Sequence, residues 1–212
     1  MKYDPQKHHR RSIRIKGYDY AQPGAYFITF CSYQRMPIFG EVVNGEMVLN
    51  DIGKIAQDEW FKTAEIRPYV KLYEDEFVIM PNHGHGIIWI AEDAVGTRRR
   101  RIPTETIEKF GKPVKGSIPT IVRSYKSAVT YAVNGMEDQR GAVLWQKNYY
   151  EHIIRNDHEL NNIGWYILNN PFNWQLDRDN LQNTRKLSPP EKVDEYVKDV
   201  EEMVLKLKAT DQ

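Results

Sequence analysis

The chain has 212 residues, enough for one domain with extensions, and its 41% apolar content suffices for a hydrophobic core. No run approaches the roughly 20 consecutive apolar residues of a membrane-spanning helix, and the polar, basic start leads us to expect no secretory signal peptide. The single cysteine, Cys31, excludes an intrachain disulfide, so we expect a cytoplasmic protein.

The net charge of +1 hides an uneven distribution of charged residues. Residues 1–35 carry seven lysines and arginines against two acids, and residues 96–126 carry nine against two. Residues 187–212, in contrast, carry four basic residues against seven acidic ones. Two basic segments are typical of proteins that bind nucleic acid, although solvated loops would give the same distribution.

The first predicted elements are an arm, a strand and a hairpin. Residues 1–24 are polar and basic and are predicted to form an N-terminal arm. Aromatic and β-branched residues dominate 25–33, which is typical of a strand. Asn44-Gly45 stands between two apolar runs, and this dipeptide predicts a two-residue turn that joins them as a hairpin over 41–49.

A helix and a second hairpin follow. Asn50 or Asp51 is predicted to cap the helix, and Pro68 bounds it. Its apolar side is formed by Ile52, Ile55, Ala56 and Trp60. Strands are then predicted at about 70–80 and 85–91, because β-branched runs alternate there with proline, asparagine and glycine.

His83 and His85 stand where the second of these strands begins. Side chains two residues apart on a strand point to the same face, so the two imidazoles are predicted to lie side by side. Two such ligands form half of a divalent-metal site and leave room for water or a substrate oxygen. A His-x-His pair also occurs in surface loops, but the glycines around this pair allow close approach of another backbone or a phosphate.

Residues 92–116 form a polar loop that contains four consecutive arginines, Arg98 to Arg101. A loop of this length in a compact domain usually marks a functional or a disordered segment. Ser117 is predicted to cap the helix that follows. Arg123 and Lys126 fall off the apolar face of this helix.

The last predicted elements are a short strand and two helices. The apolar run 142–145 is a candidate strand. The segment from Asn156 to Glu159 has the pattern of a capping box and opens a helix over 157–170, which Pro171 stops. The acidic C-terminal extension 181–212 contains a final amphipathic helix.

The predicted order is strand, helix, strand, strand, helix, strand, helix, with an additional early hairpin. This is the βαββαβ plan of ferredoxin-like domains, an α+β fold in which an antiparallel sheet of four strands carries helices on one face. We therefore expect one domain over residues 25–180, between the N-terminal arm and the C-terminal helix extension.

Tyr166 and Asn170 lie one turn apart on the predicted helix 157–170, at the edge of its apolar stripe. A tyrosine at this edge can pack its ring inward and still present its hydroxyl, and Asn170 can offer a carbonyl oxygen to the same place. Tyr166 could equally be a boundary aromatic of the core, and Tyr149 and Tyr150 are rival candidates for a nucleophile.

Three segments, in this order along the chain, resemble the HUH single-tyrosine transposases, and most closely the REP-associated tyrosine transposases. They are Met80-Pro-Asn-His-Gly-His-Gly-Ile-Ile88, Leu144-Trp-Gln-Lys-Asn-Tyr-Tyr-Glu-His-Ile-Ile-Arg-Asn156 and Trp165-Tyr-Ile-Leu-Asn-Asn-Pro171. The resemblance covers about residues 10–180. One departure is Gly84, because the residue between the two histidines is usually bulky and apolar in that family.

The resemblance implies that residues 25–180 form the catalytic domain of a single-stranded DNA endonuclease and strand transferase. It implies a divalent metal, Mg²⁺ or Mn²⁺, bound by His83, His85 and Asn170. It also implies that Tyr166 is the nucleophile, forming a covalent 5′-phosphotyrosine intermediate, and that the DNA contains a hairpin formed by a palindromic repeat. Of the two ions, Mn²⁺ suits a pair of imidazoles better.

Basic side chains are predicted to hold the DNA backbone. The candidates are Arg10, Arg11, Arg14, Lys16, Arg98, Arg99, Arg100, Arg101, Arg123 and Lys126. Whether the protein acts as a monomer or a homodimer stays open.

Other functions also stay open. A non-catalytic module that binds single-stranded DNA or RNA could use the same fold, aromatic residues and basic segments. A replication initiator or relaxase of the HUH type is favoured less, because one well-placed tyrosine follows the histidine pair. A hydrolase without a covalent intermediate would need carboxylates, for which Asp75 and Glu76 are the nearest candidates.

Overall fold

The structure of the chain is a computed structural model that describes residues 15, 17–92, 114–136, 140–177 and 179–183. The predictions for residues 1–14 and Lys16 of the N-terminal arm, for Arg98 to Arg101 and for the C-terminal amphipathic helix lie outside these residues. Within the described ranges, no helix has the length and apolar character needed to cross a membrane.

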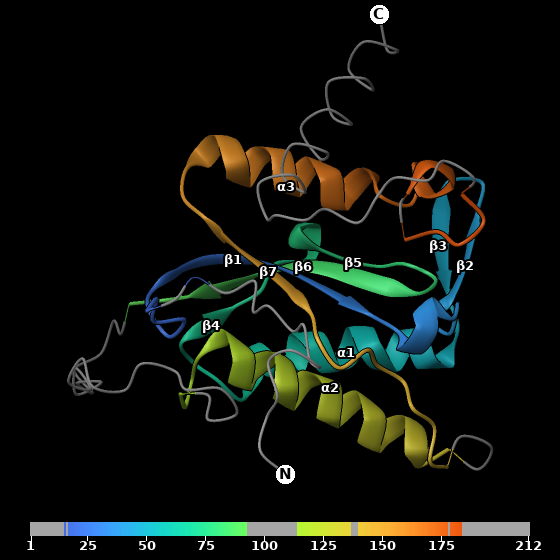
Figure 1. Cartoon of the computed structure of the whole chain (residues 1–212), viewed down its shortest axis with the longest axis horizontal. Coiled ribbons are helices and arrows are strands. Elements are labelled where there is room, and N and C mark those ends of the chain that lie inside the picture. The colour runs from blue at the N-terminus through green and yellow to red at the C-terminus, as the bar shows by residue number, and fades with distance from the viewer. Residues whose placement is uncertain (1–14, 16, 93–113, 137–139, 178, 184–212) are drawn as a thin grey trace, which may run out of the picture.

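An antiparallel sheet forms the middle layer of the structure (Figure 1). Its strands are β1 (Gly24–Cys31), β4 (Val70–Lys71), β5 (Phe77–Ile79), β6 (His83–Ile90) and β7 (Tyr150–Ile154). The order across the sheet is β4-β6-β1-β7, and β5 also pairs with β6. In the central pair, Cys31 of β1 lies opposite His83 of β6. This arrangement confirms the predicted α+β fold with an antiparallel sheet.

Two helices cover one face of the sheet, and a third covers the other face (Figure 1). The first two are α1 (Asp51–Glu65) and α2 (Ile118–Asn134), and the third is α3 (Asp157–Asn169). Side chains alternate along β1, so Tyr26 and Phe30 pack into the core beneath α1 and α2, whereas Phe27 packs with α3. The two helices of the βαββαβ plan therefore share one face, as predicted, and α3 adds a layer on the opposite face.

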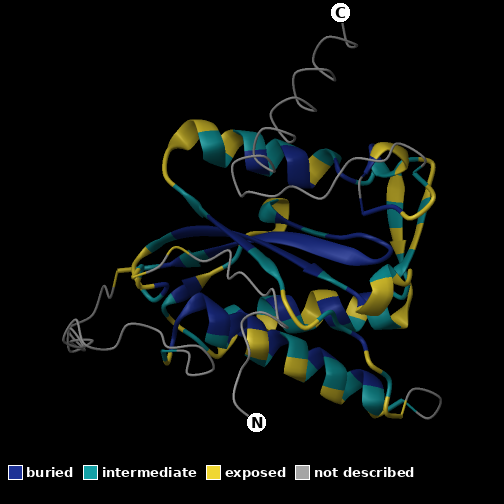
Figure 2. Cartoon of the chain, in the orientation of Figure 1, coloured by how far each residue is buried: buried dark blue, intermediate teal, exposed yellow. Residues whose placement is uncertain are grey.

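Helices on both faces bury the central strands from both sides (Figure 2). The core beneath α1 and α2 is aromatic: Trp60 stacks on Phe77 with ring centroids 4.5 Å apart, and Phe30 lies 5.0 Å from Tyr125. A Cβ atom added at Gly84 would lie 2.4 Å from the Phe30 ring. Phe30 thus occupies the space that a larger side chain between the two histidines would need, which accounts for glycine at this position.

Local sequence signals correctly predict the Asn44-Gly45 turn and the caps of α1 and α3, whereas Ser117 stands before α2 without a side-chain capping hydrogen bond. The predicted hairpin consists of β2 (Gly40–Val43) and β3 (Glu46–Leu49), which form a separate two-stranded sheet. Both turn residues have positive φ angles, 53° for Asn44 and 81° for Gly45, as the two-residue turn requires. The side chains of Asn50 and Asn156 accept backbone hydrogen bonds and cap α1 and α3.

The prediction of a strand at 142–145 is wrong. The strand of this region is β7, and Trp145 makes an isolated bridge with Ser32 instead. The indole of Trp145 packs 5.5 Å from Phe30 and donates its Nε1–H to the main-chain oxygen of Lys126. The apolar character of this run therefore reflects a loop that packs on α2, not a strand in the sheet.

Candidate active site

His83 and His85 begin strand β6 and project from the face of the sheet that α3 covers. Both side chains are fully buried. Their ring centroids lie 4.6 Å apart at an interplanar angle of 71°. The period of the strand thus places two imidazoles next to each other, as two ligands of one ion would be.

The orientation of His83 is set by its neighbour Asn82. Nδ1 of His83 lies 2.8 Å from Oδ1 of Asn82, while Nδ2 of Asn82 donates to the main-chain oxygens of Arg35 and Asp179 at 3.1 and 2.7 Å. Because the amide nitrogen of Asn82 is used as a donor, its oxygen is the acceptor and Nδ1 of His83 carries the proton. The lone pair of His83 then lies on Nε2, a buried atom without a hydrogen-bond partner.

His85 connects the sheet to helix α3. Its Nδ1 lies 2.8 Å from Oγ1 of Thr29, the residue opposite it on β1, and its Nε2 lies 3.2 Å from the hydroxyl of Tyr166. Phe27 stacks on the imidazole with ring centroids 5.5 Å apart. Tyr166 is itself buried, with 5% of its surface exposed. A phenol from a helix and an imidazole from a strand therefore meet at one point.

Asn170 follows α3, one turn after Tyr166, and is 2% exposed. Its Nδ2 donates to Oδ2 of Asp177 at 3.3 Å, and its Oδ1 is buried without a hydrogen-bond partner. The amide oxygen is thus an unused acceptor at the edge of the histidine pair.

Asp177 completes a cluster that could hold a metal ion. One ligand atom each from His83, His85 and Asp177 lies within 4.8 Å of the others, and all three residues are buried. Oδ2 of Asp177 is 3.9 Å from Nε2 of His83. Sequence reasoning missed this residue, because it lies in a turn that no periodic pattern connects to β6. The available signal was the run of asparagine and aspartate after Pro171, a composition typical of turns and of oxygen ligands.

The donor set fits a divalent metal. Two imidazole nitrogens, a carboxylate and an amide oxygen are ligands that Mn²⁺ and similar ions accept. Buried polar atoms normally have a hydrogen-bond partner, so two atoms without one need an explanation. Nε2 of His83 and Oδ1 of Asn170 are two such atoms, and coordination to a cation would satisfy each of them.

Arg35 connects this cluster to the end of strand β1. Its guanidinium forms an ion pair with Asp179 at 2.9 Å, and its main-chain oxygen accepts from Asn82. Gln34 and Arg35 both adopt left-handed conformations, with φ of 53° and 55°. Two consecutive residues of this kind are costly outside glycine, and such positions often lie beside functional sites.

Tyr149 and Tyr150 have other contacts. The hydroxyl of Tyr149 donates to Glu151 at 2.6 Å. Tyr150 lies on β7 opposite Thr29 and packs 6.2 Å from Phe27, on the same face of the sheet as the histidines. Tyr150 is therefore the closer of these two rivals to the histidine pair by position in the sheet.

The acidic residues named from the sequence lie apart from the cluster. Asp75 is exposed, and Glu76 accepts a hydrogen bond from the indole of Trp89. Burial raises the pKa of Glu76 above its usual value. The acid that joins the histidines is Asp177.

Arg123 and Lys126 lie on α2, on the other side of the sheet from α3. Arg123 is exposed. Nζ of Lys126 donates to the main-chain oxygens of Gln146 and Asn148 at 3.1 and 3.0 Å, and burial lowers its pKa to about 8. The structure thus does not bring these two cations together with the histidines and Tyr166.

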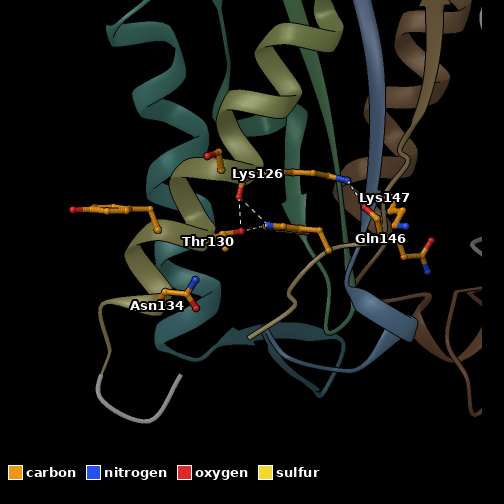
Figure 3. Close-up of a pocket in the computed structure, with 8 residues that line it drawn as sticks. Lys126, Thr130, Asn134, Gln146 and Lys147 are labelled. Carbon is orange, nitrogen blue, oxygen red and sulfur yellow. Dashed lines mark hydrogen bonds between the residues drawn. The ribbon is translucent and has the colours of Figure 1, made fainter. Parts of the chain in front are cut away.

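Lys126 also lines an open pocket of about 500 Å³ beside α2 (Figure 3). The lining residues are Lys126, Ser127, Thr130, Tyr131, Asn134, Trp145, Gln146 and Lys147. In Figure 3 the Lys126 side chain points toward the segment of Gln146 and Lys147, where it makes its hydrogen bonds. The ammonium group therefore ties the loop before β7 to α2.

Comparison with known proteins gives one close relative in sequence. No family model matches the chain. A Haemophilus influenzae protein described as uncharacterized is 40% identical over 177 residues, which cover 84% of this chain and 96% of that protein.

Two solved structures are similar to this chain at lower identity. One is a REP-associated tyrosine transposase bound to a REP hairpin, with 21% identity, a TM-score of 0.46, and coverage of 76% of this chain and 70% of that chain. The other is a candidate transposase from Deinococcus radiodurans, with 16% identity, a TM-score of 0.41, and coverage of 74% and 97%.

Proposed function

The chain belongs to the same family as the Haemophilus influenzae protein, and we propose that it is a metal-dependent single-stranded DNA endonuclease and strand transferase. The observation that carries the proposal is the 3.2 Å contact between the Tyr166 hydroxyl and Nε2 of His85, beside the unpartnered Nε2 of His83. The resemblance of three segments to the REP-associated tyrosine transposases supports the same function.

In this proposal Tyr166 is the nucleophile. A free phenol with a pKa near 10 is a weak nucleophile at neutral pH, so its oxygen needs a partner that orients it and helps it to lose its proton. The Tyr166 oxygen forms a bond to phosphorus, and the bond from phosphorus to the 3′ oxygen breaks. The phenolic proton is lost and the 3′ oxygen takes up a proton, which leaves a 5′-phosphotyrosine and a free 3′-hydroxyl. Attack by another 3′-hydroxyl reverses the chemistry and joins two strands without an external energy source.

His83, His85 and Asn170 are proposed to hold Mn²⁺ or Mg²⁺. Such an ion supplies a Lewis acid that offsets negative charge developing on the phosphate. Asn82 fixes the tautomer of His83, and Thr29 fixes the ring of His85. The residues of the chain thus hold the Nε2 lone pair of His83, the ring of His85 and the Tyr166 hydroxyl close to one another.

The proposed DNA substrate is single-stranded at the cleaved phosphate and carries a hairpin formed by a palindromic repeat. Residues 25–180 form the proposed catalytic domain. Arg123 is exposed on α2 and available to a phosphate backbone. Lys126 would have to give up its hydrogen bonds to two main-chain oxygens in order to bind a phosphate. The remaining proposed backbone contacts are Arg10, Arg11, Arg14, Lys16 and Arg98 to Arg101.

A labelled hairpin oligonucleotide with a single-stranded flank tests the proposal. With Mn²⁺, we expect a covalent protein–DNA adduct that survives denaturing electrophoresis. The Tyr166→Phe variant should lose the adduct, and Tyr150→Phe, which removes a hydroxyl from the same face of the sheet, should keep it. Hairpin binding without an adduct in the unaltered protein would contradict catalysis and support a binding module on this fold.

A further inference from the structure

We propose that Asp177 is a ligand of the metal, so that the site consists of two imidazoles and a carboxylate with Asn170 beside them. This inference rests on the proposed function, because it concerns the ion of the same site. It adds a negatively charged ligand from the segment after α3 to a ligand set that otherwise holds only neutral side chains.

The two carboxylate oxygens of Asp177 have different surroundings. Oδ1 accepts the main-chain N–H of Asp179 at 2.6 Å, which holds the turn. Oδ2 faces the site, 3.3 Å from Nδ2 of Asn170 and 3.9 Å from Nε2 of His83. Oδ1 therefore stabilises the turn, and Oδ2 is directed at the histidine pair.

The distance of 3.9 Å between Oδ2 and Nε2 of His83 is too long for a hydrogen bond. It is compatible with two ligands of one ion, since each ligand atom lies roughly 2.0–2.3 Å from the metal. Nε2 of His83 is fully buried and has no hydrogen-bond partner, and an ion bound between it and Asp177 would give it one.

The charge of the site favours the same assignment. A divalent cation held by two neutral imidazoles and a neutral amide would enter a buried site with no opposite charge, which is strongly unfavourable. Asp177 is 2% exposed and brings one negative charge to that place. The negative charge offsets half of the ionic charge and makes binding of the ion to buried histidines feasible.

Calorimetric titration of Mn²⁺ into the full-length protein, without DNA, tests this assignment. Loss of an outer hydrogen-bond partner of a metal ligand typically weakens binding by about 10- to 100-fold, so loss of a ligand should cost at least tenfold. We expect this loss in Asp177→Asn, and partial recovery in Asp177→Glu, which keeps the carboxylate. The matched control is Asp179→Asn, because this buried acid pairs with Arg35 on the same turn. Its Mn²⁺ affinity should stay close to that of the unaltered protein, because the main-chain oxygen of Asp179, and not its carboxylate, accepts from Asn82.

Three outcomes contradict the assignment. Unchanged Mn²⁺ affinity in Asp177→Asn would mean that Asp177 is not a ligand of the ion. Equal losses in Asp177→Asn and Asp179→Asn would mean that the turn, and not the Asp177 carboxylate, determines affinity. If the unaltered protein binds no Mn²⁺ but still forms the DNA adduct, the metal assignment fails while the nucleophile stands. Thermal unfolding without metal shows whether each variant is folded.

Discussion

Asn82 controls the part of His83 that faces the site. Its amide is held by two main-chain oxygens, of Arg35 and Asp179, so its Oδ1 has a fixed direction and accepts from Nδ1 of His83. A neutral imidazole has two tautomers, and the hydrogen bond at one nitrogen decides which nitrogen keeps its lone pair. In the proposed site, the dipeptide Asn82-His83 would therefore supply both a metal ligand and the group that orients it.

The Asn82→Ala variant removes this support and should allow both tautomers of His83. Nitrogen-15 NMR of the metal-free protein measures the tautomer of His83 directly. We expect one tautomer, with the proton on Nδ1, in the unaltered protein and a mixture of both in the variant. Mn²⁺ affinity should fall by about 10- to 100-fold with it. A single, unchanged tautomer in Asn82→Ala would show that another group orients the ring.

Gly84 shows how the core beneath α1 and α2 constrains the site strand. Because a Cβ atom there would lie 2.4 Å from the Phe30 ring, Gly84→Ala should destabilise the protein by about 1–3 kcal/mol through overpacking. Urea denaturation measures this change. Phe30→Leu should offset part of the loss when combined with Gly84→Ala, since the two residues share one contact.

Gly164 provides the matched control for this substitution. It lies in the middle of α3, and a Cβ atom there would meet nothing within 4 Å. Gly164→Ala should therefore leave stability unchanged or raise it by up to about 1 kcal/mol. Equal effects of alanine at both positions would contradict the packing explanation.

At the scale of elements, Lys126 connects α2 to the loop before β7. Its Nζ lies 5.7 Å from the centroid of the Trp145 ring and donates to two main-chain oxygens. Burial lowers the pKa of Lys126 from its ordinary value of 10.5 to about 8. Between these two values the unfolded chain retains a proton that the folded protein has released.

The free energy of unfolding should therefore increase as the pH rises from about 8 toward 10, because the unfolded state binds more protons at Lys126 over that range. Lys126→Met keeps the apolar stem and removes the titrating group. Urea unfolding followed by tryptophan fluorescence should show the unaltered protein gaining stability relative to this variant over that interval. Parallel pH profiles for the two proteins would contradict the burial of a charged lysine.

Elements with local signals were predictable from the sequence, and elements defined by distant contacts were not. The Asn44-Gly45 turn and the caps Asn50 and Asn156 each depend on residues within a few positions, and the structure confirms them. The strand β7 was misplaced, because its polar residues resemble a loop until they pair with β1.

The residues of the candidate site likewise include some that a local pattern predicts and one that it does not. The period of a strand predicts adjacent imidazoles at His83 and His85, and the period of a helix predicts that Tyr166 and Asn170 share a face. Asp177 could not be found by either period, because it reaches the histidines through a turn that Asn82, distant in the sequence, contacts at the main-chain oxygen of Asp179.

At the scale of the whole molecule, the site lies between the sheet and α3, whereas α1 and α2 form the aromatic core on the opposite face. The larger aromatic core therefore lies on one face of the sheet and the candidate site on the other. The separation explains how a strand can present two histidines on one side while glycines on its other side accommodate Phe30 and Trp60.

The central claim is that the Tyr166 hydroxyl and the paired imidazoles act on one phosphate. Peptide mass spectrometry of the covalent adduct, formed with hairpin DNA and Mn²⁺ and then digested with nuclease and protease, tests it most directly. We predict a single nucleotide-modified tyrosine, at Tyr166. Modification at Tyr149 or Tyr150 instead, or no modified tyrosine in protein that has cleaved its DNA, would contradict the account.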